Sequence, residues 1–479
     1  METKGELAMK PGYEYFYDES NADDDDDVNS FEETEESIYT TVLTKTNERK
    51  KIPFMYSLGR RYHPVHEYDE RKKYEGSLFW WTYRYDFPAI NCITTDAGWG
   101  CMLRSAQMML SHALRIHFKS RHWRPDPSTT KAREDDFVAG LMTWFADFPS
   151  KMESIYSLHN MCAAGMAKYE VLPGDWYGPG TACYVIRDLV ALHQQRQSNL
   201  FRVHVSSEGT VYNDLVFELM TRDSSKKKRR SQQDGKEQRK VVEEPLHPLD
   251  PAYNPEKTEL DLKEIEWDTG LLLLIPHRLG RDSLNEIYVK SVAQSFSLPQ
   301  SVGILGGRPR GARWFYGAYA DGSKVLGLDP HTVQLAPSRK KNIGTTTTTE
   351  GRAPSSIDLT DEYLASVHTP YPDVLDLNRM DPSIALGFYC RDRKDFLNLQ
   401  EALTNPNHRK RKHQPTSSTA TGAGSQLLVS FVDKVPNYMS SALVNDMMQN
   451  DDDLYCCFDG EFDDPGENEL SDEDDYVLL

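Results

Sequence analysis

Hydrophobic residues recur at two spacings along the chain, and each spacing predicts a different kind of element. Short apolar runs at 271–275, 302–305, 314–319 and 325–328 predict strands, with glycine-rich turns between the last three. After Cys101, apolar side chains return every three or four residues, which is typical of one face of a helix. These side chains are Met102, Ala106, Met109, Ala113 and Leu114. No repeat of fixed period is visible, so one α+β domain is the simplest interpretation.

Three low-complexity stretches interrupt this domain, which we place at residues 51–445. They lie at 222–250, 337–360 and 405–425, and their composition favours surface loops over regular elements. Basic runs within them raise the alternative of nucleic-acid binding or a nuclear signal. Because no aromatic side chains are interleaved to stack on bases, we interpret these runs as solvated loops and expect no nucleic-acid partner.

Acidic charge is concentrated at the two ends of the 479-residue chain, whose formal net charge is −19. Residues 1–50 carry 15 acidic and 5 basic side chains, and residues 446–479 carry 14 acidic and no basic ones. Such runs repel themselves and bury little apolar area, so we predict two disordered tails.

Several patterns are missing from the sequence. The chain shows no secretion-signal pattern, and its longest apolar run, 271–276, is far shorter than the ~18 residues of a membrane span. Its seven cysteines are an odd number, which favours reduced thiols of the cytosol over a disulfide framework. No CxxC pair exists, and the adjacent Cys456 and Cys457 lack nearby histidines, so we expect neither zinc nor another cofactor.

Cys101 is a candidate nucleophile because it follows Gly98-Trp99-Gly100 at the start of the predicted helix. The first turn of a helix stabilises a thiolate through unpaired N–H groups and the helix dipole. Glycines on either side of Trp99 permit the sharp turn that this placement needs. Local sequence leaves the alternative of a small buried hydrophobic cysteine open.

The segment that ends in Asp329-Pro330-His331 supplies a candidate base and its orienting group. It is predicted to be a hairpin followed by extended chain, where side chains two residues apart share a face. The Asp329 carboxylate can therefore reach Nδ1 of His331 and leave Nε2 to face a thiol. Other histidines are weaker candidates: two lie in the predicted helix, His277 follows Pro276 in a predicted turn, and His63, His66 and His368 lack such a carboxylate.

Five motifs resemble, in order, those of the autophagin family, the autophagy-related protein 4 cysteine peptidases. They are GWGCMLRS around Cys101, DWYGPGT around Trp176, the stretch 275–315, LDPHT at Asp329, and DPSIALGFYC at Asp381. The match covers most of residues 51–445 outside the inserts. The inserts are longer and more basic than expected for compact members of the family.

The resemblance implies a papain-like fold with a small additional α/β subdomain and a Cys-His-Asp triad. It assigns Cys101 as the nucleophile, His331 as the general base and Asp329 as its orienter. It places the oxyanion-stabilising tyrosine at Tyr83, for which ordinary aromatic packing is the alternative. Trp176 matches a tryptophan near the family's active site, and a core aromatic is the alternative there.

The resemblance also implies the reaction and the partners. The family cleaves GABARAP-type ubiquitin-like autophagy modifiers after a C-terminal glycine, on precursors and on phosphatidylethanolamine conjugates at membranes. We therefore expect a cytoplasmic, monomeric cysteine endopeptidase. Two alternatives stay open: a deubiquitinase-like thiol peptidase, and a non-catalytic adaptor that binds the modifier.

The acidic C-terminus contains a candidate docking motif, in which Tyr476, two spacers and Leu479 follow Asp472–Asp475. Such a segment can add to an exposed sheet edge with its two apolar side chains in pockets. The alternative is a solvating tail that ends by chance in apolar residues. A weaker candidate, residues 39–42, lies in the N-terminal tail.

Overall fold

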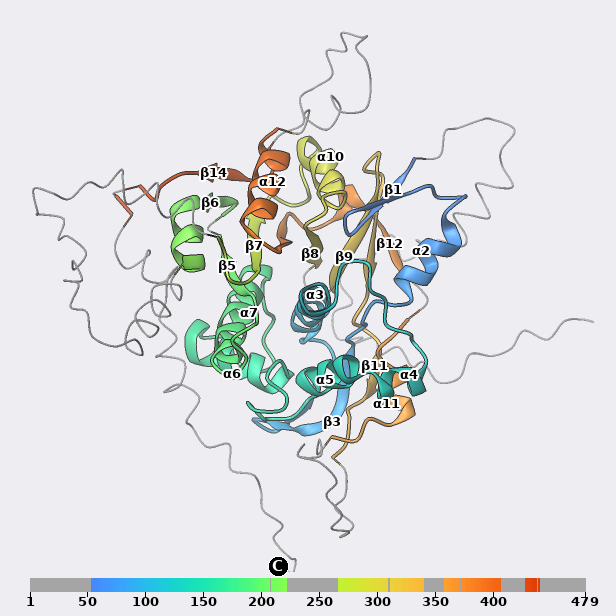
Figure 1. Cartoon of the computed structure of the whole chain (residues 1–479). Helices are drawn as coiled ribbons and strands as arrows, with labels where there is room; N and C mark the ends of the chain where they lie inside the picture. The colour runs from blue at the N-terminus through green and yellow to red at the C-terminus, as the bar shows by residue number, and fades with distance from the viewer. Residues whose placement is uncertain are drawn as a thin grey trace, which may run out of the picture.

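The computed structural model of the chain describes residues 53–206, 208–221, 266–308, 311–339, 357–369, 372–405, 427–436 and 438–439 (Figure 1). The acidic tails at 1–50 and 446–479 and the insert at 222–250 lie outside the described residues, as do most positions of the other two inserts. Among the described residues, no helix is both long and apolar enough to cross a membrane.

A largely antiparallel sheet forms the centre of the described body. In spatial order its main strands are β12 (Asp373–Asp376), β10 (Lys324–Leu328), β9 (Gly311–Tyr319), β8 (Ser301–Arg308), β13 (Ser383–Cys390), β7 (Leu271–Arg278) and β5 (Arg202–Val205). Two short strands, β1 (Met55–Ser57) and β2 (Arg60–Tyr62), extend it where β1 pairs with β9. The four strands predicted from the sequence correspond to β7, β8, β9 and β10. The β5–β7 pair is parallel.

Successive side chains of the sheet strands point to opposite faces and pack into two separate hydrophobic cores. On β7, Leu272 and Leu274 pack into one core, whereas Leu271 and Leu273 pack into the other. This period of two is what an extended chain buried on both faces requires. The two apolar faces explain why the strand sequences are almost continuously hydrophobic.

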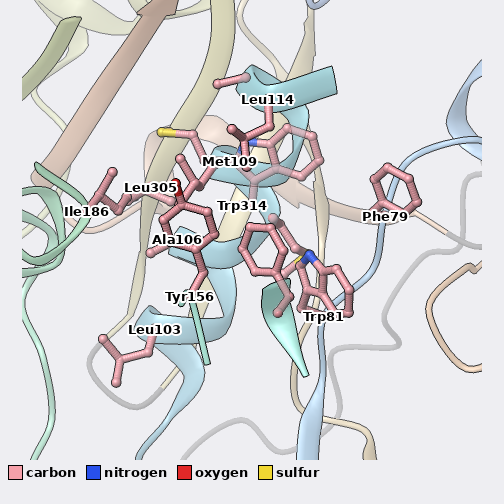
Figure 2. Packing of buried hydrophobic residues seen from close by; sticks show 14 of the residues in the cluster. Phe79, Trp81, Leu103, Ala106, Met109, Leu114, Tyr156, Ile186, Leu305 and Trp314 are labelled. Carbon is pink, nitrogen blue, oxygen red and sulfur yellow. The ribbon is translucent and has the colours of Figure 1, made fainter. Parts of the chain in front are cut away.

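Helix α3 (Cys101–Phe118) covers one face of the sheet, where it packs on β8 and β9. Figure 2 shows Met109 and Leu114 of this helix beside Leu305 and Trp314 of the sheet. The same core includes residues of α5 (Asp136–Phe145), α6 (Leu158–Tyr169) and α7 (Pro179–Gln194). The opposite face is covered by α10 (Glu286–Ser295) and α12 (Arg393–Thr404), which appear together near the top of Figure 1. Every residue from Cys101 to Ile116 is buried, so α3 is a central helix.

Smaller elements complete the described body. A three-stranded sheet joins β11 (Val333–Leu335), β3 (Tyr83–Ile90) and β4 (Ile93–Thr95), and a second small sheet pairs β6 (Thr210–Tyr212) with β14 (Ser430–Val432). The remaining elements with assigned bounds are α2 (Tyr68–Glu75), α4 (Thr129–Glu134), α11 (Asp361–Ala365) and the 3-10 helix η1 (Leu377–Arg379). Mixed helices and sheets place the chain in the α+β class.

His277 does not lie in a turn, contrary to the sequence prediction. Pro276 and His277 both belong to β7 and pair with Ala385 and Ile384 of β13. The proline lies beyond the last residue of β7 that pairs with β5, which ends at Val205, and its carbonyl still accepts the Gly209 N–H at 3.1 Å. Only the N–H that a proline lacks is missing there. The proline therefore marks the end of one pairing and not the end of the strand.

Candidate active site

Cys101 is the first residue of α3 and is completely buried. The turn before it depends on both glycines. Gly98 has a φ of +86°, which favours glycine, and a Cβ on Gly100 would lie 2.4 Å from Oδ2 of Asp96. The backbone N–H groups of Trp99 and Gly100 donate to the Asp96 carbonyl at 3.2 and 2.9 Å. The sequence prediction of a sharp turn into a helix is thus confirmed.

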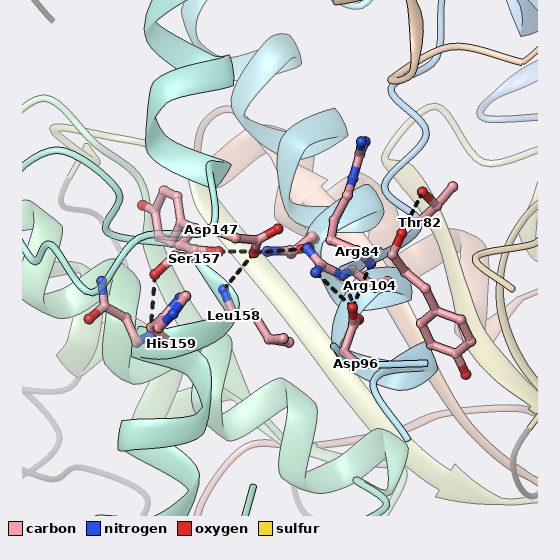
Figure 3. A network of polar contacts seen from close by, with 12 residues as sticks. Thr82, Arg84, Asp96, Arg104, Asp147, Ser157, Leu158 and His159 are labelled. Atoms are coloured by element: carbon pink, nitrogen blue, oxygen red, sulfur yellow. Dashed lines mark hydrogen bonds and ion pairs between the residues drawn. The ribbon is translucent and has the colours of Figure 1, made fainter. Parts of the chain in front are cut away.

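A buried ionic network fixes this turn to the second turn of α3 (Figure 3). Arg104 donates to Asp96 through Nε at 2.8 Å and through Nη2 at 3.1 Å, and to Asp147 through Nη1 at 3.0 Å. The backbone N–H of Arg84 also donates to Oδ1 of Asp96, at 2.6 Å. Burial raises the pKa of Asp96, whereas its contacts with Arg104 oppose that rise. The network ties β3, the glycine turn and α3 together.

Asp329 and His331 follow β10 and meet as predicted. Oδ1 of Asp329 accepts the His331 backbone N–H at 3.1 Å and also contacts Nδ1 of the imidazole. The indole N–H of Trp80 donates to the Asp329 carbonyl at 2.7 Å, and the Tyr83 N–H donates to the Pro330 carbonyl at 2.9 Å. These bonds dock the segment against the chain around β3.

The structure brings the imidazole of His331 to the thiol of Cys101, and a hydrogen bond joins the two side chains. Burial raises the pKa of Cys101, but contacts with His331 and the backbone N–H of Ala312 outweigh burial and lower it. Burial lowers the pKa of His331, whereas hydrogen bonds to Asp329 and Cys101 raise it to about 10. The pair is therefore poised as thiolate and imidazolium.

Tyr83 lies at the start of β3, with its ring edge-on to the His331 ring at 5.3 Å between centroids. Its hydroxyl is buried beside the Cys101 sulfur, close enough to affect the pKa of that thiol. Among the described residues, its one hydrogen-bond partner is the Cys101 thiol. A donor is thus available next to the nucleophile.

Sequence reasoning missed Arg313 on β9. Its Nη2 donates to Oδ2 of Asp329 at 3.0 Å, and its Nε contacts Asp373 of β12. Burial raises the pKa of Asp329, but the hydrogen bond from His331 and the charge of Arg313 hold it below its ordinary value. Arg313 is one of three arginines in the segment GRPRGARWF, and the sequence alone does not indicate which carboxylate its side chain contacts.

A family model for the peptidase C54 catalytic domain matches residues 68–402 of the chain. The chain belongs to the peptidase C54 family. Its similarity to curated proteins agrees with this assignment. Cysteine protease ATG4B of Xenopus laevis is 32% identical over 345 residues, which cover 71% of this chain and 77% of that protein. Cysteine protease ATG4B of Gallus gallus is 33% identical over 346 residues, 71% of this chain and 78% of that protein.

Cysteine protease ATG4A of Homo sapiens is 28% identical over 369 residues, which cover 76% of this chain and 80% of that protein. The resemblance to the autophagins and the papain-like α+β fold class are confirmed. This C54 chain is a cysteine peptidase of autophagy.

Other described cysteines of this C54 peptidase differ from Cys101. Burial raises the pKa of the thiols of Cys162, Cys183 and Cys390. Cys92 is exposed in the turn between β3 and β4 with a φ of 72°. In the described ranges, no three His, Cys, Asp or Glu side chains gather as a group that could hold a metal ion.

Trp176 precedes α7 and is 39% exposed, so it is not a core side chain. Its role in substrate binding stays a prediction. Tyr476 and Leu479, and the N-terminal candidate at 39–42, lie outside the described residues.

Proposed function

We propose that this C54 peptidase hydrolyses the bond after the C-terminal glycine of GABARAP-type autophagy modifiers. The substrates would be modifier precursors and phosphatidylethanolamine conjugates on membranes, met by a cytoplasmic monomer. The observation that carries the proposal is the contact of Cys101 with His331, which Asp329 orients in turn. Both reactions are acyl transfers that differ only in the leaving amine.

In the proposed mechanism the Cys101 thiolate attacks the glycine carbonyl carbon. The developing oxyanion would accept hydrogen bonds from the Tyr83 hydroxyl and from the Cys101 N–H, which is among the first N–H groups of α3 and lacks an intrahelical partner. The His331 imidazolium protonates the leaving amine as the carbon–nitrogen bond breaks. Neutral His331 then takes a proton from water, whose oxygen displaces Cys101 from the thioester.

The complete burial of Cys101 supports a glycine at the scissile bond. A substrate strand without a side chain can approach a recessed thiol more closely than a branched residue can. Trp176, as an exposed aromatic side chain, is proposed to contact the modifier's tail. Tyr476 and Leu479 are proposed to dock on the folded modifier.

A cleavage panel tests this function against the two alternatives. Purified wild-type chain should cleave GABARAP-type precursors and leave ubiquitin precursors intact. Cys101→Ser should retain modifier binding and lose cleavage, because a hydroxyl is a much poorer nucleophile than a thiolate. Cys92→Ser, the nearest other cysteine in sequence, should behave as wild type.

The contrary outcomes each point elsewhere. Cleavage of ubiquitin precursors at a similar rate would favour the deubiquitinase-like alternative. Binding of the modifier without cleavage by the wild-type chain would favour the adaptor. Retention of most activity by Cys101→Ser would remove this thiol from the mechanism.

A further inference from the structure

Arg313 lies on the same sheet face as two carboxylates from neighbouring strands. Phe315 of β9, Gly327 of β10 and Asp373 of β12 are cross-strand partners. Arg313 and Asp329 each lie two residues from that row, and positions two apart on a strand share a face. Gly327 contributes no side chain between them, so the guanidinium can reach across β10.

The guanidinium contacts both carboxylates and a backbone carbonyl. It donates to Asp329 Oδ2 through Nη2 at 3.0 Å, to Asp373 through Nε, and to the Gly311 carbonyl through Nη1 at 3.0 Å. The Arg313 side chain is only 13% exposed and that of Asp373 is 17% exposed. A shielded guanidinium with three directed contacts has little freedom to move.

Each contact is adjacent to a part of the candidate triad. With Oδ2 of Asp329 held by Arg313, Oδ1 remains turned to the His331 imidazole. The Gly311 carbonyl belongs to the peptide whose N–H is that of Ala312, and this N–H reaches the Cys101 sulfur. One side chain therefore holds the carboxylate behind the base and a backbone donor beside the nucleophile.

We propose that Arg313, anchored by Asp373, is a positioning residue that sets the orientation of Asp329 and of the Ala312 N–H in the active site. The inference rests on the proposed function, since it assigns Asp329, His331 and Cys101 the roles of a triad. It adds Arg313 and Asp373, which act on the triad through Asp329 and the Ala312 N–H and do not contact substrate.

The groups that face Asp329 determine the sign of the pH effect. They are His331 on its own segment, Arg313 on β9, Asp373 on β12 and Tyr83 on β3, and Cys101 on α3 acts on the far side of His331. Loss of the Arg313 cation should raise the Asp329 pKa, whereas loss of the Asp373 charge should lower it. The imidazolium needs ionised Asp329, so activity on the acid side of the pH profile rises as Asp329 ionises. This acid limb should move to higher pH when the Arg313 charge is lost and to lower pH when the Asp373 charge is lost.

The test compares Arg313→Gln, Arg313→Lys and Asp373→Asn in the full-length chain, with modifier-precursor cleavage measured across pH. Arg313→Gln should lower kcat by ~10- to 100-fold with little change in KM, the scale expected for a misplaced catalytic group. Its acid limb should shift to higher pH. Arg313→Lys should restore the limb without restoring kcat fully, because an ammonium lacks the planar fork.

Arg187→Gln is the matched control, because Arg187 is 12% exposed, pairs with Asp188 on α7 and contacts none of the candidate triad. It should lower stability without moving kcat or the acid limb. Thermal unfolding of each variant separates loss of fold from loss of positioning. If Arg313→Gln does not fold, the other two variants still decide the matter: Arg313→Lys should keep the wild-type limb with a lowered kcat, and Asp373→Asn should move the limb to lower pH.

Alkylation of Cys101 by iodoacetamide across pH, corrected with a Cys101→Ser background, provides a readout that needs no peptidase substrate. Arg313→Gln should shift this profile in the same direction as the cleavage profile. A wild-type profile typical of an ordinary thiol would overturn the proposed triad. A different result would overturn the role of Arg313 alone. In that result the wild-type chain is alkylated at the low pH expected of an activated thiol, and Arg313→Gln leaves both kcat and the acid limb unchanged.

Discussion

The Tyr83 hydroxyl is a buried polar group whose one hydrogen-bond partner among the described residues is the Cys101 thiol, which is a weak one. A buried polar group left wholly unsatisfied costs about 1–3 kcal/mol of folding free energy, and a weak partner offsets only part of that cost. A phenylalanine would fill the same space without that cost. The cost is understandable if the hydroxyl finds a strong acceptor only when an oxyanion develops beside Cys101.

Tyr83→Phe should therefore lower kcat by roughly 10²-fold, the scale seen when one oxyanion donor is removed. Stability should change little, because the variant loses only a weak contact with the Cys101 thiol. Steady-state cleavage and thermal unfolding measure the two effects. The control is Tyr156→Phe, which removes a buried hydroxyl bound to His193 at 2.8 Å and should reduce stability while sparing kcat. An unchanged kcat in Tyr83→Phe would show that the hydroxyl does not stabilise the oxyanion and that Tyr83 serves only in aromatic packing.

At the scale of elements, the start of α3 depends on charges that flank it. Arg104 is buried between Asp96 and Asp147, and removing one partner of a buried ionic network leaves the others without compensation. Arg104→Leu should reduce the free energy of unfolding by about 3–5 kcal/mol. Urea unfolding measures this.

Arg133→Leu provides the comparison for that variant. Arg133 pairs with Asp361 at the surface, where both side chains are about half exposed, and such pairs contribute roughly 0–1 kcal/mol. A loss in Arg104→Leu no greater than in Arg133→Leu would show that the buried network does not hold the turn.

Local patterns in the sequence predicted the elements but not the contacts between them. The helix after Cys101, the four strands and the Asp329–His331 contact each depend on residues a few positions apart. The contacts of Arg313 with Asp373 and of Trp80 with the Asp329 carbonyl depend on strand register and on packing across the body, which no local spacing encodes. The prediction of a turn at His277 is wrong because proline does not always end a strand: Pro276 lies in β7 beyond the end of its pairing with β5.

At the scale of the whole molecule, the acidic tails lie outside the described body, yet one carries the candidate docking motif. The double variant Tyr476→Ala/Leu479→Ala, or removal of residues 472–479, should weaken modifier binding and slow cleavage of intact modifier. Loss of a tether lowers the effective concentration of substrate without altering chemistry. A short peptide substrate that lacks the folded modifier should be cut at the wild-type rate.

Binding measured by calorimetry and cleavage measured in parallel would check this. Phe462→Ala changes another aromatic residue of the same acidic stretch, one followed by Asp463, Asp464 and Pro465, and should have no effect. Equal affinity of wild type and the double variant for the modifier would rule docking out.

The insert at 337–360 has described residues at both of its ends, and these ends lie side by side. Arg339 and Ile357 pair in an antiparallel bridge, the Asp358 N–H donates to the Ser338 carbonyl at 2.8 Å, and Ile357 is 1% exposed. Because the entropy of closing a loop grows only slowly with its length, the free energy of folding depends weakly on how many residues join these two positions. The chain between Arg339 and Ile357 should therefore tolerate insertions and deletions. Evolution can change its length, and a fluorescent reporter can be inserted between these two residues, without altering the packing of the peptidase core.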